Sequence, residues 1–218
     1  MIDSCRKQIA EEDADAIADI LCNDEKDRAP LLDLLRNTPD IRDDVLDDPR
    51  LVASVMEIAD KSTLPPRLYF YVGVRHFLSK KGMNDRELAD YLSTMCIHFL
   101  FHTPWGTDNP MMHPDLYISR VVEVLSDAVE TEDWNKAHCL HSHLGHYLLF
   151  FTGLLHKVLK SMIRQGGRPM ENYEEIGRAH FKHASNFDVP IADLYEKLHK
   201  DFPTIRLCLN ELSISSFL

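Results

Sequence analysis

The feature that most constrains the fold is a long apolar segment, residues 132–164, in which both sides of a helix are suited to burial. With about 100° between successive helical residues, most large apolar side chains between Leu140 and Leu159 fall on one half of the helix surface. The opposite half holds small residues, among them Gly145 and Gly153, which let another segment approach closely. A helix covered on both sides lies inside a bundle. The sequence therefore predicts an all-α protein, an irregular multi-helix bundle around a long central helix at residues 132–164.

Helix start signals recur along the rest of the chain. Thr38 before Pro39, and Asp48 before Pro49, each place a capping residue ahead of a proline at the first helical position. Residues 62–82 are rich in aromatic and β-branched residues, which favour strands, but their helical spacing and terminal Gly82 favour a helix. Further helices are expected over residues 3–21, 83–102, 115–129, 170–186, 188–201 and 203–212.

The domain organisation follows from length and charge. A chain of 218 residues can bury a core without disulfides, and it contains no internal repeat and no linker-like tract. Residues 1–60 hold 17 acidic and 7 basic side chains, so they carry nearly all of the net charge of −11. We expect a single helical domain, residues 1–218, in which a small acidic layer, residues 1–62, packs on a main bundle, residues 63–218.

Composition also excludes classes of partner. An acidic surface repels phosphate backbones and anionic lipids, so we expect no nucleic acid and no membrane among the partners. No apolar run reaches the ~18 residues that span a bilayer, and the first residues do not resemble a secretory signal. The five cysteines form no CxxC pair, which is typical of reduced thiols. We therefore expect a cytoplasmic protein.

Histidines are the main candidates for a site. His138, His141, His143 and His146 fall within nine residues, directly before the longest apolar run. Residues three or four apart share a helix face, so the first two or the last two could bind one metal ion together. All four cannot, because their directions spread over about 200°. Additional ligands at the same spacings are available from two other pairs: His98 with His102, and His180 with His183.

A subset of these eight histidines is the predicted metal site. Nitrogen-rich sites are typical of transition metals, and Zn or Fe is the expected ion. Residues 103–114 contain three prolines and could form a loop that covers the site. The alternative for each histidine is a core side chain that is satisfied by packing and hydrogen bonds. A porphyrin held by an axial histidine is a further alternative.

The sequence contains no complete catalytic motif. It has no HExxH, no Walker A sequence, no GxSxG and no calcium loop, so no catalytic residue is assigned and enzymatic activity stays open. We favour a non-catalytic helical module that binds a protein partner or forms a homo-oligomer. The alternative is a histidine-ligated metal- or cofactor-binding helical protein, which could be an enzyme.

Overall fold

The computed structural model describes residues 4–58, 60–102 and 110–212, and within these ranges every regular element is helical. The prediction of an all-α, multi-helix fold is confirmed. Contacts divide the chain into two compact units, which are described separately: unit 1 is residues 1–100 with 212–218, and unit 2 is residues 101–211. The acidic layer at 1–62 and the main bundle at 63–218 stay predictions. None of the helices in the described ranges is both long and apolar enough to cross a membrane.

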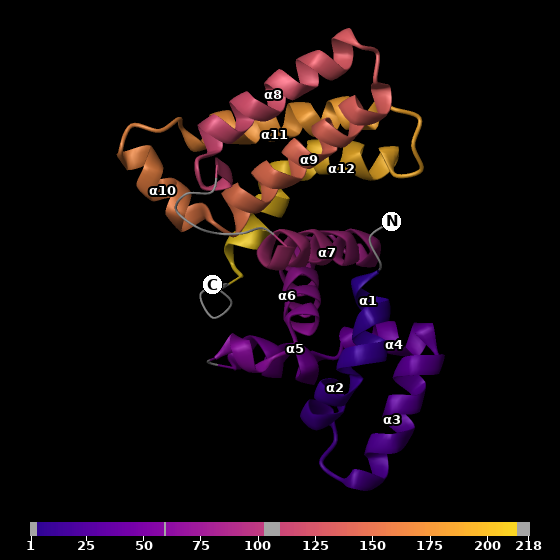
Figure 1. Ribbon diagram of the computed structural model, residues 1–218. Coiled ribbons are helices and arrows are strands. Elements are labelled where there is room, and N and C mark those ends of the chain that lie inside the picture. Colours follow the sequence, from indigo (N-terminus) through magenta and orange to yellow (C-terminus); the bar gives the residue numbers. More distant parts are fainter. Residues whose placement is uncertain (1–3, 59, 103–109, 213–218) are drawn as a thin grey trace. The chain divides into compact units, whose positions relative to one another are not determined.

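Unit 1 is built from helices of 4 to 17 residues (Figure 1). Several of them begin at a side chain that accepts a hydrogen bond from the first turn, among them Ser4, Asp24 and Asp48, whereas the predicted cap Thr38 forms no such bond. Asp48 accepts a hydrogen bond from the backbone N–H of Arg50 (2.8 Å), which confirms it as a cap. Residues 62–82 contain a helix, as expected, and its first turn holds Pro66. The helices that begin in this unit are α1 (Cys5–Gln8), α2 (Ala14–Leu21), α3 (Glu25–Asn37), α4 (Pro39–Leu46), α5 (Pro49–Glu57), α6 (Pro66–Lys80) and α7 (Arg86–His102).

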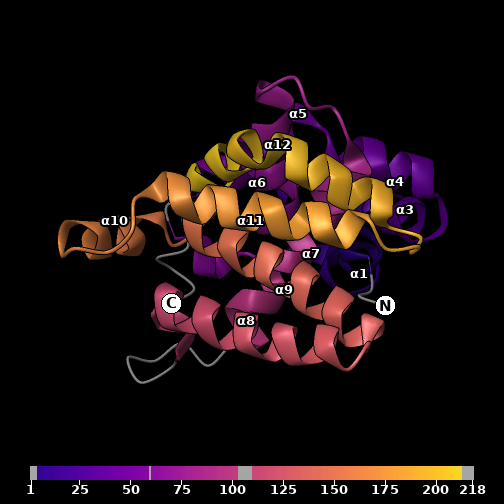
Figure 2. The same ribbon diagram turned by 90° about the horizontal axis from the view of Figure 1, so that it is seen from above.

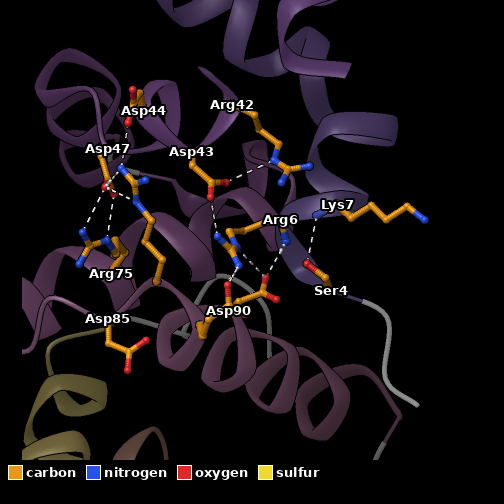
Figure 3. A network of polar contacts seen from close by, with 12 residues as sticks. Ser4, Arg6, Lys7, Arg42, Asp43, Asp44, Asp47, Arg75, Asp85 and Asp90 are labelled. Atoms are coloured by element: carbon orange, nitrogen blue, oxygen red, sulfur yellow. Dashed lines mark hydrogen bonds and ion pairs between the residues drawn. The ribbon is translucent and has the colours of Figure 1, made fainter. Parts of the chain in front are cut away.

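An ion-pair network joins four of these helices (Figure 3). Arg6 of α1 is only 8% exposed, and its guanidinium lies 2.6 Å from a carboxylate oxygen of Asp43 in α4. Its backbone N–H donates to Asp90 of α7 (2.7 Å). In the same region, Arg75 of α6 contacts both carboxylate oxygens of Asp47, the residue directly after α4 (3.0 and 3.1 Å). Part of the acidic excess of the N-terminal segment is therefore paired with arginine inside unit 1.

Unit 2 is organised around α9 (Trp134–Gly153). This helix packs against α11 (Met170–Ser185), α12 (Ala192–Asn210) and α8 (Pro114–Glu130). Figures 1 and 2 both show these helices running side by side. A shorter helix, α10 (His156–Arg164), follows α9. The centre of unit 2 is therefore a helix, although a shorter one than the sequence indicated.

The single helix predicted over residues 132–164 is not confirmed, because the chain leaves helical geometry between α9 and α10. Leu155 has a ψ of 19°, outside the α-helical range. The carbonyl of Gly153 accepts a hydrogen bond from His156 Nδ1 (2.9 Å). In a continuous helix that carbonyl would accept from the backbone N–H of Lys157. A side chain of the next turn thus replaces the backbone donor, and this competition ends helix α9.

The two helices predicted on either side of Pro203 are a single helix, α12. Proline has no N–H to donate to the carbonyl four residues earlier, which here belongs to His199. Arg178 of α11 supplies that donor through Nε (3.1 Å). The freed carbonyl is satisfied, so α12 continues through the proline.

Glycines mark the close contacts of α9 with its neighbours. A Cβ added to Gly145 would lie 2.8 Å from Cδ1 of Phe181, and one added to Gly153 would lie 2.8 Å from Cβ of Leu209. Both distances are too short for a real contact. The expectation that these glycines admit a close neighbour is confirmed, although the approaching atoms belong to side chains.

Candidate functional site

The four clustered histidines lie on α9 and point to three different neighbouring helices. The Nε2 atom of His143 forms a short hydrogen bond with the hydroxyl of Tyr117 in α8. The rings of His138 and His146 lie 5.7 and 5.9 Å from the ring of Tyr195 in α12. All three therefore lie within interhelical contacts. His143 agrees with the alternative of a satisfied core histidine, whereas the buried Nε2 atom of His138 has no hydrogen-bond partner among the described residues.

The fourth, His141, meets the other histidine pair of unit 2. Its Nδ1 atom lies 2.9 Å from Nδ1 of His180 in α11. Its ring also stacks on the ring of His183, with centroids 4.7 Å apart and an interplanar angle of 26°. The structure thus brings together one histidine of α9 with two of α11. In each of the pairs expected along α9, the two histidines contact different neighbouring helices.

Burial keeps the central pair of imidazoles neutral. Partial burial, with a smaller contribution from the neighbouring charge of His183, lowers the pKa of His141 to about 4. Burial, together with the nearby His141, lowers the pKa of His180 to about 4. Both rings are therefore deprotonated near neutral pH, which is the state in which an imidazole nitrogen binds a metal ion.

The predicted eight-histidine set does not gather at one point. Within residues 4–58, 60–102 and 110–212, no group of three or more His, Cys, Asp and Glu side chains is arranged to hold a metal ion. His98 and His102 are exposed on α7, and His183 is exposed on α11. What remains is a pair of facing imidazoles, His141 and His180.

A surface pocket of about 420 Å³ opens beside His141. Two of its walls are formed by partly exposed apolar residues, Trp134 (55% exposed) and Val129 (45% exposed). Sequence reasoning missed this pocket, because its residues come from α8, α9, α11 and the two positions that follow α11, and only the packing of these helices brings them together. Its lining comprises Val129, Trp134, Ala137, His141, His183, Asn186 and Phe187.

The turn between α8 and α9 fixes the position of Trp134. Glu132 has a φ of +55°, a left-handed conformation that is uncommon for a residue other than glycine. Its neighbour Asp133 donates its backbone N–H to the carbonyl of Ala128 (2.8 Å). The Asp133 carboxylate accepts from the N–H of Lys136 (3.0 Å) and caps α9. The wall of the pocket is therefore held by hydrogen bonds at both sides of a tight turn.

The loop expected to cover the site falls mostly outside the described residues, which exclude 103–109. Pro110–Met112 form a short 3-10 helix, and the carbonyl of Met111 accepts a hydrogen bond from the hydroxyl of Tyr147 (2.7 Å). This end of the segment is therefore tied to α9. Its role as a cover stays a prediction.

The chain was compared with protein-family models, curated proteins and solved structures, and none of them matches it.

Proposed function

We propose that this chain is a non-catalytic helical binding protein whose unit 2 binds a divalent transition metal ion through His141 and His180. The observation that carries the proposal is the distance of 2.9 Å between their Nδ1 atoms, which face each other from α9 and α11. The proposal narrows the eight candidate histidines to two.

The spacing of the two nitrogens fits a particular coordination geometry. A metal ion about 2.05 Å from each nitrogen separates them by about 2.9 Å at a right angle, and by about 3.3 Å at a tetrahedral angle. Neighbouring positions of an octahedral or square-planar ion therefore match best, as in Fe(II), Ni(II) or Cu(II). Zn(II), the other expected ion, is typically tetrahedral and would need the rings to separate by about 0.4 Å.

The same distance also suits an N–H···N hydrogen bond in which one imidazole donates its proton to the other. Metal binding requires the donating ring to change tautomer: its single proton moves from Nδ1 to Nε2, so that both neutral rings present an unprotonated Nδ1 to the ion. Because both pKa values lie near 4, the ion does not have to displace a charge-carrying proton at neutral pH. Water molecules or a small ligand would complete the coordination sphere.

Elemental analysis of protein purified without a histidine tag tests the proposal, followed by titration with Cu(II), Ni(II), Fe(II) and Zn(II). We expect close to one equivalent of metal in wild-type protein and a loss of at least about tenfold in affinity in His141→Ala and in His180→Ala. His113→Ala, an exposed histidine of the same unit, is the matched control. Unchanged affinity in both site variants would overturn the proposal. An absorbance scan of the same sample tests the porphyrin alternative.

A second candidate function is self-association or binding of a protein partner. Val122 and Val129 lie seven residues apart on one face of α8 and are 43% and 45% exposed, and two neighbouring apolar side chains in water support an interface. Light scattering of the wild type and of Val122→Asp tests it. A dimer that the substitution dissociates supports this function, and a monomer in both cases counts against a homo-oligomer.

The proposal also includes the cellular compartment and the classes of partner that the protein does not bind. We place the protein in the cytoplasm, with no nucleic acid and no membrane as partner. The five cysteines, all free, support a reducing compartment, and the net charge of −11 supports the absence of polyanionic partners. Fractionation of the native host cells and a salt-dependent DNA-binding assay check these statements.

A further inference from the structure

We propose that the pocket beside His141 binds a small organic cation that carries an apolar body, such as an aromatic ammonium ion. This inference goes beyond metal binding and does not depend on it. It rests on the walls of the pocket, on the polar groups that line it and on the charges around it.

The walls suit an apolar body of modest size. The pocket of about 420 Å³ falls in the range of small-molecule sites. Its inner side is built on a buried cluster that includes Leu125, Ala128 and Ala137, against which Phe187 packs. Its outer side is Trp134, of which 55% is exposed. Burying that indole against a ligand removes a large apolar surface from water.

A few polar groups in the pocket are available to orient a ligand. The side chains of His183 and Asn186 are exposed, and neither forms a hydrogen bond with another described residue. The indole N–H of Trp134 is likewise uncommitted within the described part of the chain. An apolar pocket with a small number of open donors and acceptors is the usual form of a site for a small organic ligand.

The charged residues next to the pocket in the sequence favour a positively charged ligand over a negatively charged one. Glu130, Glu132 and Asp188 adjoin lining residues in the sequence, are exposed, and form no ion pair within the described ranges. Of the nearby lysines, Lys182 is paired with Glu196 (2.7 Å). The other, Lys136, lies about 160° around α9 from Trp134.

Aromatic rings strengthen that selection. Trp134 and Phe187 present π-systems whose faces attract an ammonium group, and such contacts contribute most when the cation is partly desolvated. Aromatic walls, together with unpaired carboxylates on residues that adjoin the lining in the sequence, fit an ammonium ion better than an anion of the same shape.

Three probes of one shape and different charge test the inference: phenethylammonium, 2-phenylethanol and 3-phenylpropionate. Each is titrated by calorimetry into the full chain after removal of metal with a chelator, so that the result is separate from metal binding. We expect the cation to bind at least about tenfold more tightly than the alcohol, and the anion not to bind. The inference is overturned if the alcohol or the anion binds as tightly as the cation, or if no probe binds at millimolar concentration.

Variants locate the binding. Trp134→Ala should weaken binding of phenethylammonium at least about tenfold. Leu207→Ala truncates a side chain of α12 that is 44% exposed and does not line the pocket, and it should bind as the wild type does. The Glu130→Gln/Glu132→Gln pair should reduce the preference for the cation over the alcohol. Equal binding by Trp134→Ala and wild type would place the cation elsewhere and overturn the assignment.

Discussion

Arg178 of α11 and His199 of α12 exchange two hydrogen bonds. Arg178 Nε donates to the carbonyl of His199 (3.1 Å), and His199 Nδ1 donates to the carbonyl of Arg178 (2.9 Å). The first bond fills the acceptor that Pro203 leaves empty, because proline has no N–H for the carbonyl four residues earlier. The continuity of α12 therefore depends on a side chain of the neighbouring helix.

We expect Arg178→Met to lower the free energy of unfolding by about 1–3 kcal/mol, because the carbonyl of His199 is then left without a donor. In a Pro203→Ala background, the restored backbone N–H can bond to that carbonyl. The same Arg178→Met change should then cost clearly less. Urea denaturation of the four proteins of this double-mutant cycle measures the coupling. An equal loss in both backgrounds would show that Arg178 stabilises the protein for another reason.

Gly177 of α11 lies against α12, and we expect Gly177→Ala to destabilise the protein. The added Cβ would lie 2.7 Å from Cε2 of Phe202 and 3.2 Å from Cβ of Leu148. Overpacking of this kind costs about 1–3 kcal/mol and exceeds the helix-propensity gain of about 1 kcal/mol. Thermal unfolding measures the sum of the two effects. Adding Phe202→Leu should recover part of the loss, and a Gly177→Ala variant more stable than wild type would contradict the packing argument.

Glu132 adopts a left-handed conformation at the turn before Trp134, so replacement by glycine should stabilise unit 2. Glycine adopts a positive φ without steric cost, so we expect the free energy of unfolding to rise by about 0.5–1 kcal/mol. The matched control is Glu130→Gly, two residues earlier at the end of α8, which should be destabilising by up to about 1 kcal/mol because that residue is helical. Chemical denaturation distinguishes the two. The conformational argument fails if both variants shift stability in the same direction.

Because the pKa values of His141 and His180 are lowered by folding, we expect the protein to become less stable in mild acid. The pKa of each ring is about 4 in the folded protein and about 6.5 in an unfolded chain. The unfolded state therefore binds more protons between these values, and the free energy of unfolding falls as the pH drops from about 6.5 towards about 4. Because both rings are partly exposed, we expect roughly 1 kcal/mol per histidine between about pH 7 and about pH 5.

To isolate this effect, the double variant His141→Gln/His180→Gln is compared with the wild type. The free energy of unfolding of both proteins is measured by urea denaturation at the same two pH values. This variant should lose less stability on acidification than the wild type. Other groups that titrate in this range are common to both proteins and cancel. The same loss in both proteins would remove the pair from the acid response.

Local sequence signals predicted most of the helices. Asp48 and Pro49 begin a helix as expected, since the cap and the fixed φ of proline act within a single turn. The predicted helix boundaries were wrong where a tertiary or side-chain contact determines whether the helix continues. The continuation of α12 through Pro203 needs Arg178, which is distant in sequence, and the end of α9 depends on a hydrogen bond from His156 to Gly153.

The candidate site was predicted only in part. Helical spacing separated the directions of the four histidines on α9, which contact three different helices in the structure. It could not show that His141 meets His180, because that contact depends on how α9 packs against α11. The pocket was missed for the same reason, since Val129, Trp134 and Phe187 share no periodic pattern.

The proposed pairing of His141 with His180 is tested most directly by electron paramagnetic resonance of the protein loaded with one equivalent of Cu(II). The account predicts nitrogen hyperfine coupling from two equatorial imidazoles in wild type, and from one in His141→Ala and in His180→Ala, while His113→Ala keeps the wild-type spectrum. A spectrum without imidazole coupling, or one that neither site variant changes, would contradict it.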